Sequence, residues 1–239
     1  MLYDISFTPP VALAKIGYCG CHFRPEQFTE FAFERYGVHQ PATLFNAVAK
    51  RKSEFLAGRY CSSRALVNVF GTDSRIDINP DRSPKWPHGV VGSITHSKDR
   101  AAAIVASDKE YIGLGIDFEK LMAFPQAQEL QHQILADQDL ECEELRQCGT
   151  GFFITLAFSA KESLYKALYP TTQQYMEFQD LYIKRVGTNA VTLSLLKTLN
   201  SNWQCGTDFE ILYAKYDDEI FTMACLENAL PAESTRKIS

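Results

Sequence analysis

The sequence predicts an α+β fold, in which helices and strands occur in separate runs along the chain. Apolar residues recur at helical spacing over residues 41–70, and a second helical region begins near residue 126. Strand-like apolar segments lie on both sides of that second region. The chain has 239 residues, 46% hydrophobic and 22% charged, so it can form one large or two small domains with a buried core.

The first 89 residues contain one clear helical segment. Residues 1–40 mix aromatic residues, glycine, proline and charge without a clear period. Residues 41–70 are expected to form one long or two short helices, which Gly71 ends. Residues 71–89 are expected to be a loop, because proline recurs there. The helical spacing is carried by Leu44, Phe45, Val48, Phe55, Leu66, Val69 and Phe70.

Short strands are predicted beyond residue 89, before and after the second helical region. Each is an apolar run bounded by turn residues. Their ranges are 90–95, 101–106, 111–118, 181–186, 191–196, 209–215 and 220–226. Tight turns are expected at residues 107–110 and 217–219, and the tail after Pro231 is expected to be frayed.

The second helical region is predicted in two parts. The first runs from about residue 126 to residue 146, and Gly149-Thr150-Gly151 breaks it. An apolar run from Phe152 then leads into a helix near Ser159–Tyr169. Pro170 is expected to end that helix, since proline has no N–H to continue the hydrogen bonding.

Charge and hydropathy weigh against two classes of partner. The net charge is −5, so the chain as a whole lacks the positive surface of a nucleic-acid-binding protein. The longest uncharged stretch, residues 147–160, is too short for a membrane span, which needs about 20 apolar residues. No nucleic-acid partner and no membrane span are therefore expected.

The cysteines are expected to be free thiols. There are seven, an odd number, and no charged and then apolar leader opens the chain, so a reducing, cytoplasmic location is expected. The segment Cys19-Gly20-Cys21-His22 contains closely spaced Cys and His residues, as one half of a zinc site does. No second pair of ligands follows at a suitable spacing, so zinc is not expected there.

The segment Ile112–Glu119 places two carboxylates on one side of a predicted strand. Because side chains alternate along a strand, the residues expected to face the core are Ile112, Leu114, Ile116 and Phe118. The opposite face then holds Gly113, Gly115, Asp117 and Glu119. Two carboxylates one pleat apart can share a hard cation, and the glycines would let a bulky ligand approach the backbone. Taken alone, the segment favours a solvated strand face whose glycines mark a bulge over a ligand site, and it does not match a dinucleotide-binding turn.

Two further segments carry polar groups at meaningful spacing. In the predicted helix, Glu162 and Lys166 are four residues apart and so share one face. A capping box from Ser159 to Glu162 and a surface ion pair with Lys166 explain these residues without any function. In Gly92–Ser97, hydroxyls and an imidazole at a strand end can hydrogen-bond to phosphate.

Three of these segments are informative in combination, namely Gly92–Ser97, Gly115–Glu119 and Phe158–Lys166. Together they resemble the 4′-phosphopantetheinyl transferase family, more narrowly its monomeric surfactin/enterobactin-synthetase type. The motifs Gly-x-Asp-x-Glu and Ser-x-Lys-Glu-Ser-x-x-Lys occur in this order and spacing, and their co-occurrence makes the match specific. Glu54–Arg59 and Pro84–Ser93 support it. The resemblance covers about residues 50 to 170.

The resemblance implies a fold and a reaction. The fold would have two similar lobes related by pseudo-two-fold symmetry, with the active site in the cleft between them. Residues 1–108 would form the lobe that binds the coenzyme A phosphates, and residues 109–239 the lobe with the carboxylates. The reaction would be the Mg²⁺-dependent transfer of 4′-phosphopantetheine from coenzyme A to a serine of an acyl or peptidyl carrier protein, releasing 3′,5′-ADP.

The resemblance also implies roles for individual residues. Mg²⁺ would be held by Asp117, Glu119 and Glu162, and three carboxylates suit a hard, oxygen-preferring ion. Glu162 would be the general base, directly or through a metal-bound water, and Lys166 would reach the phosphates. The remaining positions expected to bind coenzyme A are Arg51, Arg59, Lys85, Thr95 and His96.

Two other interpretations remain open at this point. The same carboxylates could serve a Mg²⁺-dependent phosphoesterase or nuclease, although the negative net charge weighs against nucleic acid. A non-catalytic coenzyme A or carrier-binding module is the second alternative, and the intact set of three carboxylates weighs against it. The resemblance favours a monomer that serves secondary metabolism, such as siderophore, non-ribosomal peptide or polyketide synthesis. It leaves the carrier, its docking surface and the tolerance for acyl-coenzyme A open.

Overall fold

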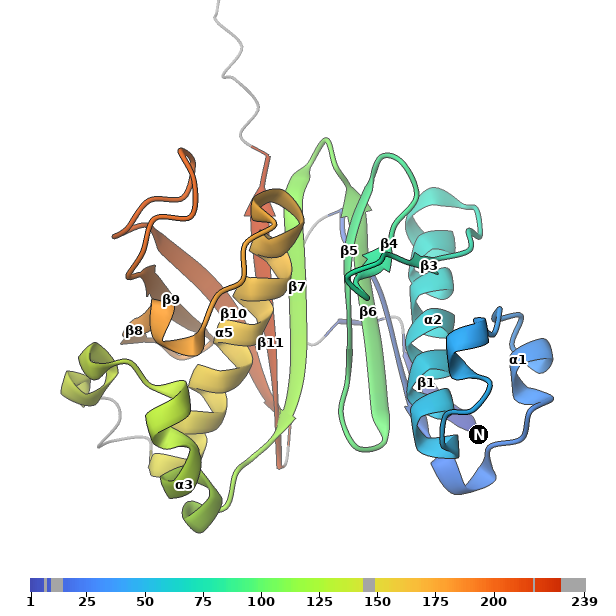
Figure 1. Ribbon diagram of the computed structural model, residues 1–239, viewed down its shortest axis with the longest axis horizontal. Coiled ribbons are helices and arrows are strands. Elements are labelled where there is room, and N and C mark those ends of the chain that lie inside the picture. The colour runs from blue at the N-terminus through green and yellow to red at the C-terminus, as the bar shows by residue number, and fades with distance from the viewer. Residues whose placement is uncertain (7, 10–14, 144–148, 217, 229–239) are drawn as a thin grey trace, which may run out of the picture.

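Two antiparallel sheets organise the chain in the computed structural model (Figure 1), which describes residues 1–6, 8–9, 15–143, 149–216 and 218–228. The four-stranded sheet has the order β1 (Leu2–Ser6), β2 (Gly17–Phe23), β6 (Arg100–Ser107) and β5 (Val90–His96). The five-stranded sheet has the order β7 (Tyr111–Lys120), β11 (Glu219–Glu227), β10 (Asp208–Tyr216), β9 (Ala190–Leu195) and β8 (Leu181–Val186). The architecture therefore mixes helices and antiparallel strands, as predicted.

The helices and short elements lie around these sheets. The long helices are α2 (Ala49–Phe70) and α5 (Thr150–Thr172), and the shorter ones are α1 (Ala32–Arg35) and α3 (Phe124–Ile134). Single 3₁₀ turns are η1 (Pro25–Gln27), η2 (Ala42–Leu44), η3 (Asp137–Glu141) and η4 (Phe178–Asp180). A two-residue pair, β3 (Asp77–Ile78) with β4 (Pro84–Lys85), lies inside the predicted loop.

Three apolar cores fix the order of these layers. Helix α2 packs on the four-stranded sheet through Ala57, Cys61 and Ala65. Helix α5 packs on the five-stranded sheet, where Phe153, Leu156 and Leu164 are buried, and α3 packs on α5. The third core lies between the sheets and contains residues of β2, β6, β7 and β11, namely Tyr18, Ala102, Ile104, Ala106, Tyr111, Leu114, Ile116, Phe118, Phe221 and Met223. The two sheets thus face each other, and each carries a long helix on its other face.

The first predicted helical segment is confirmed over residues 49–70, and its first part is a 3₁₀ turn in place of a helix. Turn η2 comes first, Val48 is extended with ψ 154°, and α2 follows without a break. Helix α2 ends at Gly71, which has φ 71° and donates its N–H to the Val67 carbonyl. Glycine adopts this left-handed conformation at little cost, which explains why the helix stops there.

Strand β7 departs from the predicted alternation at one end. Leu114, Ile116 and Phe118 face the core between the sheets, as expected. Ile112 instead packs against the α5 core, and Tyr111 takes the position between the sheets. The pairing of β7 with β11 shifts register at this point, so the prediction for Ile112 is wrong because a β-bulge reverses the alternation there.

The glycines of β7 were expected to admit a ligand, and this expectation is also wrong. A Cβ on Gly115 would lie 1.8 Å from the Ser163 carbonyl oxygen, and one on Gly113 would lie 2.1 Å from that of Ala167. Both carbonyls belong to α5. The bare glycine face therefore allows the α5 backbone, and not a ligand, to lie directly on the strand.

Helix α5 is longer than predicted at both ends. It begins at Thr150 and includes Gly151, because the apolar run that follows buries Phe153, Ile154 and Leu156 against the sheet. Pro170 lies inside the last turn, so it does not end the helix. A proline this close to the end removes a single hydrogen bond, and the helix stops at Gln173, which has φ 51°.

The helical region predicted over residues 126–146 is interrupted. Helix α3 ends at Ile134, Leu135 is extended with ψ 138°, and η3 follows. The interruption places Asp139 in the interior, where its carboxylate accepts hydrogen bonds from Ala136, Lys161 and Ile183. Residues 144–146 of this prediction lie outside the described residues, as do Asp217 of the predicted turn and the tail after Pro231.

The turn at residues 107–110 joins two strands that do not pair with each other. The Glu110 N–H donates to the Ser107 carbonyl at 3.0 Å, so the tight turn is confirmed. Strand β6 nevertheless belongs to the four-stranded sheet and β7 to the five-stranded sheet. This turn is where the chain passes from one sheet to the other.

The N-terminal region contains two strands that the irregular sequence did not reveal. Cys19 and Cys21 on β2 point into the α2 core beside Cys61, and the Cys21 and Cys61 sulfurs are 3.5 Å apart. Cys19, Cys21 and Cys61 are free thiols, as are Cys205 and Cys225. Across the described ranges, no helix is long and apolar enough to cross a membrane.

Candidate active site

A large cavity lies beside α2 and is lined by basic side chains. Its volume is about 1360 Å³, above the roughly 300–1,000 Å³ of common small-molecule pockets. Its walls come from residues 37–47, from α2, from residues 73–85 and from β5. All of the lining residues precede Ser97 in the chain. Four of the predicted coenzyme A positions line it together, namely Arg51, Arg59, Lys85 and His96.

Two arginines of α2 face this cavity without a full set of partners. Arg59 stacks on Phe55, with its guanidinium 4.8 Å from the ring centroid, and donates weakly to the Asp77 carbonyl at 3.4 Å. Its Nε is buried and has no hydrogen-bond partner among the described residues. Burial and the neighbouring Arg51 guanidinium lower the pKa of Arg59 to about 10, while Asp77 opposes them. Two cations held together this way favour an anionic ligand.

Three acidic residues also line this cavity, namely Glu54, Asp73 and Asp77, and Glu54 lies on α2 beside Arg51. Its carboxylate is buried and lies 3.6 Å from Arg51 and 3.9 Å from Lys50. His96 is exposed to the same cavity. Desolvation lowers the pKa of the His96 imidazole, Glu54 opposes this, and Arg51, Lys166 and Asp117 also act on it. His96 lines the cavity and the preceding residue, Thr95, hydrogen-bonds to Asp117, so β5 places the cavity next to a second cluster that contains Asp117 and Lys166.

In this second cluster, Asp117 is held by two donors on the same oxygen. Asp117 Oδ1 accepts from Lys166 Nζ at 2.7 Å and from Thr95 Oγ1 at 3.1 Å. Lys166 Nζ also donates to the Ile116 carbonyl at 3.2 Å. The other oxygen, Asp117 Oδ2, is buried and has no hydrogen-bond partner among the described residues. The predicted surface pair is thus replaced, because Lys166 binds the carboxylate of the adjacent strand and not that of Glu162.

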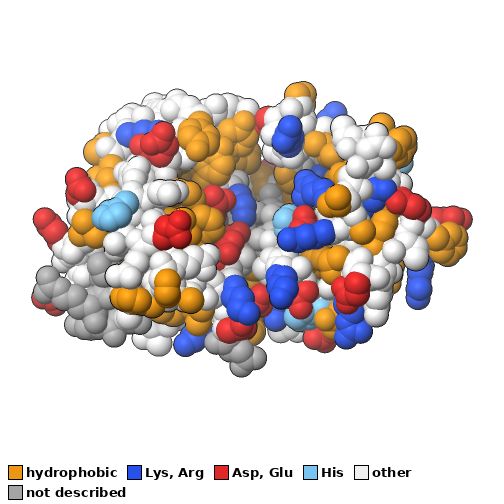
Figure 2. Space-filling view, turned by 60° about the horizontal axis from the view of Figure 1, so that its bottom comes forward, with side chains coloured by type: hydrophobic (Ala, Val, Ile, Leu, Met, Phe, Trp, Pro, Cys, Tyr) orange, Lys and Arg blue, Asp and Glu red, His pale blue; other side chains and the backbone are white. Residues whose placement is uncertain are grey.

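Glu119 and Glu162 share the electrostatic environment of Asp117. Burial raises the pKa of Glu119 to about 7, with Asp117 and Glu162 adding to the rise and Lys166 opposing it. Burial also raises the pKa of Glu162, where Lys166 lowers it and Asp117 raises it further. Figure 2 shows acidic and basic side chains facing one another across a hollow in the middle of one face of the molecule. Three carboxylates that disfavour one another's charge suit a site for a cation.

The carboxylate oxygens of Asp117, Glu119 and Glu162 are ligands of the type that a hard divalent cation prefers. The Oδ2 atom of Asp117, buried and without a partner among the described residues, also fits such an ion. Within the described ranges, however, no three His, Cys, Asp or Glu side chains are grouped so as to hold a metal ion. Lys166 is the cation that contacts Asp117 here. Metal binding would therefore require the carboxylates to come together.

Helix α5 is fixed on the sheet by buried hydroxyl groups. The Ser159 and Ser163 hydroxyls lie 2.9 Å and 2.5 Å from Thr222 Oγ1. Thr222 pairs directly with Asp117 across β11 and β7. The capping-box explanation of Ser159 is therefore wrong, because Ser159 lies in the middle of α5 and anchors it to β11.

The structure also shows site residues that the motifs did not reveal. Arg75 and Arg82 line the cavity from the loop that contains β3 and β4, and Arg75 pairs with Asp77 at 2.6 Å. Tyr169 of α5 donates to Asp81 of that loop at 3.0 Å. Two arginines in a proline-rich loop were the available signal, but loop residues carry no period that would place them.

Comparison with known families gives two matches to one superfamily. Residues 39–106 match the model of the 4′-phosphopantetheinyl transferase N-terminal domain. Residues 113–219 match the model of the 4′-phosphopantetheinyl transferase superfamily. The two ranges adjoin the turn that connects the sheets, and together they include Arg51, Arg59, Asp117, Glu162 and Lys166.

The chain is also similar to curated proteins over about half of its length. It is 41% identical to enterobactin synthase component D of Escherichia coli K12 over 128 residues, which is 53% of this chain and 59% of that protein. It is 38% identical over 124 residues to the Salmonella typhi protein of the same name, covering 52% of this chain and 51% of that one. It is 32% identical over 143 residues to 4′-phosphopantetheinyl transferase Npt of Nocardia iowensis, covering 59% and 62%. The matched part thus spans between half and two thirds of these relatives.

Proposed function

We propose that this chain, which belongs to the 4′-phosphopantetheinyl transferase superfamily, moves the phosphopantetheine group of coenzyme A onto a serine hydroxyl of a carrier protein. The observation that carries this proposal is the juxtaposition of two features. One is a large cavity with under-partnered arginines, and the other is the Asp117–Lys166 cluster that His96 links to it electrostatically.

Coenzyme A would occupy the cavity beside α2. Its 3′-phosphate and pyrophosphate are strong acceptors, and guanidinium groups bind them with paired, charge-assisted hydrogen bonds. Arg51 and Arg59 supply two such groups, and Lys85 and His96 line the same space. The buried Nε of Arg59 is a donor that a phosphate oxygen would satisfy. A cavity of about 1360 Å³ accommodates a long nucleotide ligand.

Asp117, Glu119 and Glu162 would hold Mg²⁺. When bound, the ion would offset the charge of the pyrophosphate and polarise the phosphorus that is attacked. Asp117 Oδ2 would be the oxygen available for the ion, since Oδ1 already accepts two hydrogen bonds. Lys166 would turn from Asp117 toward the phosphate oxygens and add positive charge there.

The chemistry would then be a balanced phosphoryl transfer. The carrier serine Oγ attacks the β-phosphorus of coenzyme A, and the bond from that phosphorus to the bridging oxygen breaks. The serine proton passes to the Glu162 carboxylate, and 3′,5′-ADP leaves with the bridging oxygen. Catalysis rests mainly on positioning and charge stabilisation, as in other phosphoryl transfers.

The two sheets would correspond to two functional lobes, with the active site in a cleft between them. Residues 1–108 hold the cavity and its basic side chains, and residues 109–239 hold the carboxylates and α5. The passage from β6 to β7 at the turn of residues 107–110 supports a boundary there. The similar arrangement of one helix on each sheet supports a pseudo-two-fold relation between the lobes.

The carrier would belong to a siderophore or other peptide-synthetase pathway. The names of several relatives, enterobactin synthase component D, support this choice. Free thiols at Cys19, Cys21, Cys61, Cys205 and Cys225 support a reducing, cytoplasmic location. A monomer would suffice, since one chain supplies both the cavity and the carboxylates.

The test is an intact-mass measurement on apo carrier proteins of the peptide-synthetase, polyketide and fatty-acid types. Each is incubated with this protein, coenzyme A and Mg²⁺, and a parallel reaction contains EDTA. We expect a gain of one phosphopantetheine, fastest on the peptide-synthetase carrier and abolished by EDTA. No gain on any carrier, with coenzyme A still bound, would instead support a non-catalytic binding module.

A further inference from the structure

Thr95 lies at the point where the two sheets meet. Its side chain is buried, with 3% of its surface exposed, and it does not line the cavity. Its hydroxyl donates to Asp117 Oδ1 at 3.1 Å and accepts from the Phe118 N–H at 3.3 Å. It therefore contacts both a candidate metal ligand and the backbone of the strand that carries that ligand.

The chemistry of a hydroxyl limits what else Thr95 can bind. A threonine hydroxyl has a single hydrogen, and phosphate oxygens accept hydrogen bonds but do not donate them. The single hydrogen of Thr95 is committed to Asp117. Thr95 is thus poorly suited to the role of a phosphate ligand, which the resemblance to the family implied for it.

The same contact decides which oxygen of Asp117 is free. Thr95 and Lys166 both donate to Oδ1, and Oδ2 is left buried without a partner among the described residues. Should Lys166 move to a phosphate, Thr95 would remain as the donor that holds the carboxylate in this orientation. Groups that orient a metal-binding carboxylate in this way affect metal affinity without touching the metal.

From these contacts, and given the proposed function, we infer that Thr95 is a positioning residue that orients Asp117 so that Oδ2 is presented to a divalent cation. The inference assigns Thr95 no contact with coenzyme A. It concerns the cation and Asp117, so it can be tested even on a chain that transfers nothing.

Ser93 provides a matched control on the same strand. Its hydroxyl accepts from the Ile116 N–H at 3.1 Å, just as Thr95 accepts from Phe118, but it makes no contact with Asp117. Both residues are buried on β5 and both join β5 to β7. A purely structural contribution would therefore be shared by Ser93 and Thr95, whereas of these two residues only Thr95 donates a hydrogen bond to Asp117.

The experiment compares Thr95→Val, Thr95→Ser and Ser93→Ala in the full chain. Calorimetry measures Mn²⁺ affinity in the presence of coenzyme A, and coenzyme A affinity in EDTA, and thermal unfolding reports stability. We expect Thr95→Val to weaken Mn²⁺ binding by about tenfold or more, the usual effect of losing an outer-shell partner. The affinity of Thr95→Val for coenzyme A in EDTA should equal that of the wild type. Thr95→Ser should bind Mn²⁺ as the wild type does, because serine keeps the hydroxyl. Ser93→Ala should lower only the melting temperature.

Each of three other results would overturn the inference. Weaker coenzyme A binding in EDTA with unchanged Mn²⁺ affinity would make Thr95 a phosphate ligand. Equal effects of Thr95→Val and Ser93→Ala on Mn²⁺ would make its role structural only. A wild-type chain that binds no Mn²⁺ would leave Thr95 nothing to position. Failure of the wild type to modify any carrier, by contrast, would count against the proposed transferase and not against Thr95, provided that Mn²⁺ binds.

Discussion

At the scale of single residues, the site is defined by groups whose hydrogen bonding is incomplete. Buried polar atoms in folded proteins are nearly always paired, so those without partners are informative. The Arg59 Nε and Asp117 Oδ2 atoms are both buried and unpaired among the described residues. The first is a cationic donor and the second an anionic acceptor. They match the two components expected in this site, a phosphate and a cation.

Arg59→Ala should weaken coenzyme A binding by about tenfold or more. The variant loses a charge-assisted hydrogen bond, which contributes about 1.5–3 kcal/mol, or a factor of ten for each 1.4 kcal/mol. Calorimetric titration at two salt concentrations measures the effect, and the difference between variant and wild type should shrink at high salt. Arg64→Ala is the control, because Arg64 is an exposed residue of the same helix outside the cavity. Equal affinities for the Arg59 and Arg64 variants would remove Arg59 from the site.

Glu162→Gln should lower the rate of transfer by about 10²- to 10⁴-fold, the usual contribution of a general base. The substitution keeps the size of a half-buried side chain and removes its charge, so the unfolding midpoint should not fall. Steady-state transfer to an apo carrier and thermal unfolding give the two quantities. Glu129→Gln on the exposed surface of α3 is the control and should leave both unchanged. A Glu162 variant as fast as wild type would refute its catalytic role.

At the scale of elements, the position of α5 on β7 sets how far Glu162 and Lys166 of the helix lie from Asp117 of the strand. Two glycines on β7 and the hydroxyls of Ser159, Ser163 and Thr222 hold the helix there. Helix α5 can thus approach β7 closely enough for Lys166 to reach Asp117 at 2.7 Å. The spacing of the motif residues along the sequence becomes a spatial cluster only through this contact.

Gly115→Ala should destabilise the protein by about 3 kcal/mol or more, because the new Cβ overpacks against backbone. That Cβ would lie 1.8 Å from the Ser163 carbonyl oxygen, which only a shift of α5 can relieve. Denaturant unfolding and the transfer assay measure the losses of stability and activity. Gly58→Ala is the control for stability alone, because Gly58 lines the cavity. Its Cβ would meet only the Ile94 side chain at 2.9 Å, and alanine is favoured in a helix by about 1 kcal/mol. Similar stabilities for the two variants would contradict this role of Gly115.

The sequence was sufficient for the elements with a strong local pattern and insufficient where tertiary packing decides. The repeating apolar residues predicted the end of α2 and the strands after residue 180 to within a residue or two, but they placed the start of the helical segment at residue 41 and not at Ala49. Strand β2 was missed because its buried cysteines and glycines lack the usual strand residues. For the site, the motifs indicated Asp117 and Lys166, which the structure brings into contact, whereas the joint role of Asp117, Glu119 and Glu162 stays a prediction. They could not show that Lys166 pairs with Asp117, because that contact crosses 49 residues of chain.

At the scale of the whole molecule, the two sheets are joined at the edge where β5 meets β7. No backbone pairing between these strands occurs in the described sheets, and the Ser93 and Thr95 hydroxyls bind the β7 backbone in its place. A second joint lies where Arg100 of β6 pairs with Glu219 of β11 at 3.0 Å. The Arg100 guanidinium also lies over the Phe118 and Tyr216 rings, at 5.0 Å and 5.7 Å from their centroids. These contacts hold the cavity beside the carboxylates.

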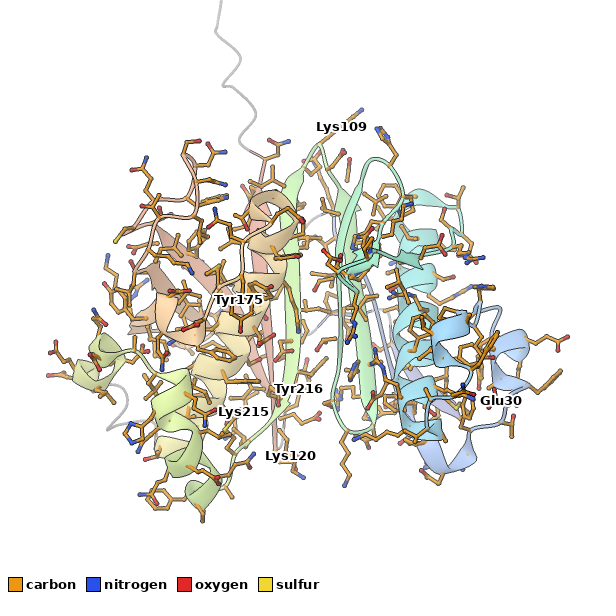
Figure 3. All side chains as sticks on the ribbon, in the orientation of Figure 1. Glu30, Lys109, Lys120, Tyr175, Lys215 and Tyr216 are labelled. Atoms are coloured by element: carbon orange, nitrogen blue, oxygen red, sulfur yellow. The ribbon has the colours of Figure 1, made fainter. Side chains whose placement is uncertain are left out.

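Arg100→Met should lower the free energy of unfolding by about 2 kcal/mol, because Glu219 loses the charged partner of a largely buried pair. Denaturant unfolding measures the change. Lys120→Ala is the control and should have no measurable effect, since its ion pair with Asp218 is exposed. Lys120 and Tyr216 lie at the same end of the five-stranded sheet (Figure 3), so both variants test this region of the molecule. Equal losses for the two would show that Arg100 does not join the sheets.

Under the proposed function, this chain couples cleavage of coenzyme A to modification of a carrier serine. The most direct test quantifies 3′,5′-ADP and holo-carrier in the same Mg²⁺-containing reaction over time, for the wild type and for Asp117→Asn. We predict that the wild type forms the two products in equal molar amounts along one time course, and that the variant forms neither. Cleavage of coenzyme A without formation of holo-carrier would contradict the claim and identify a phosphoesterase.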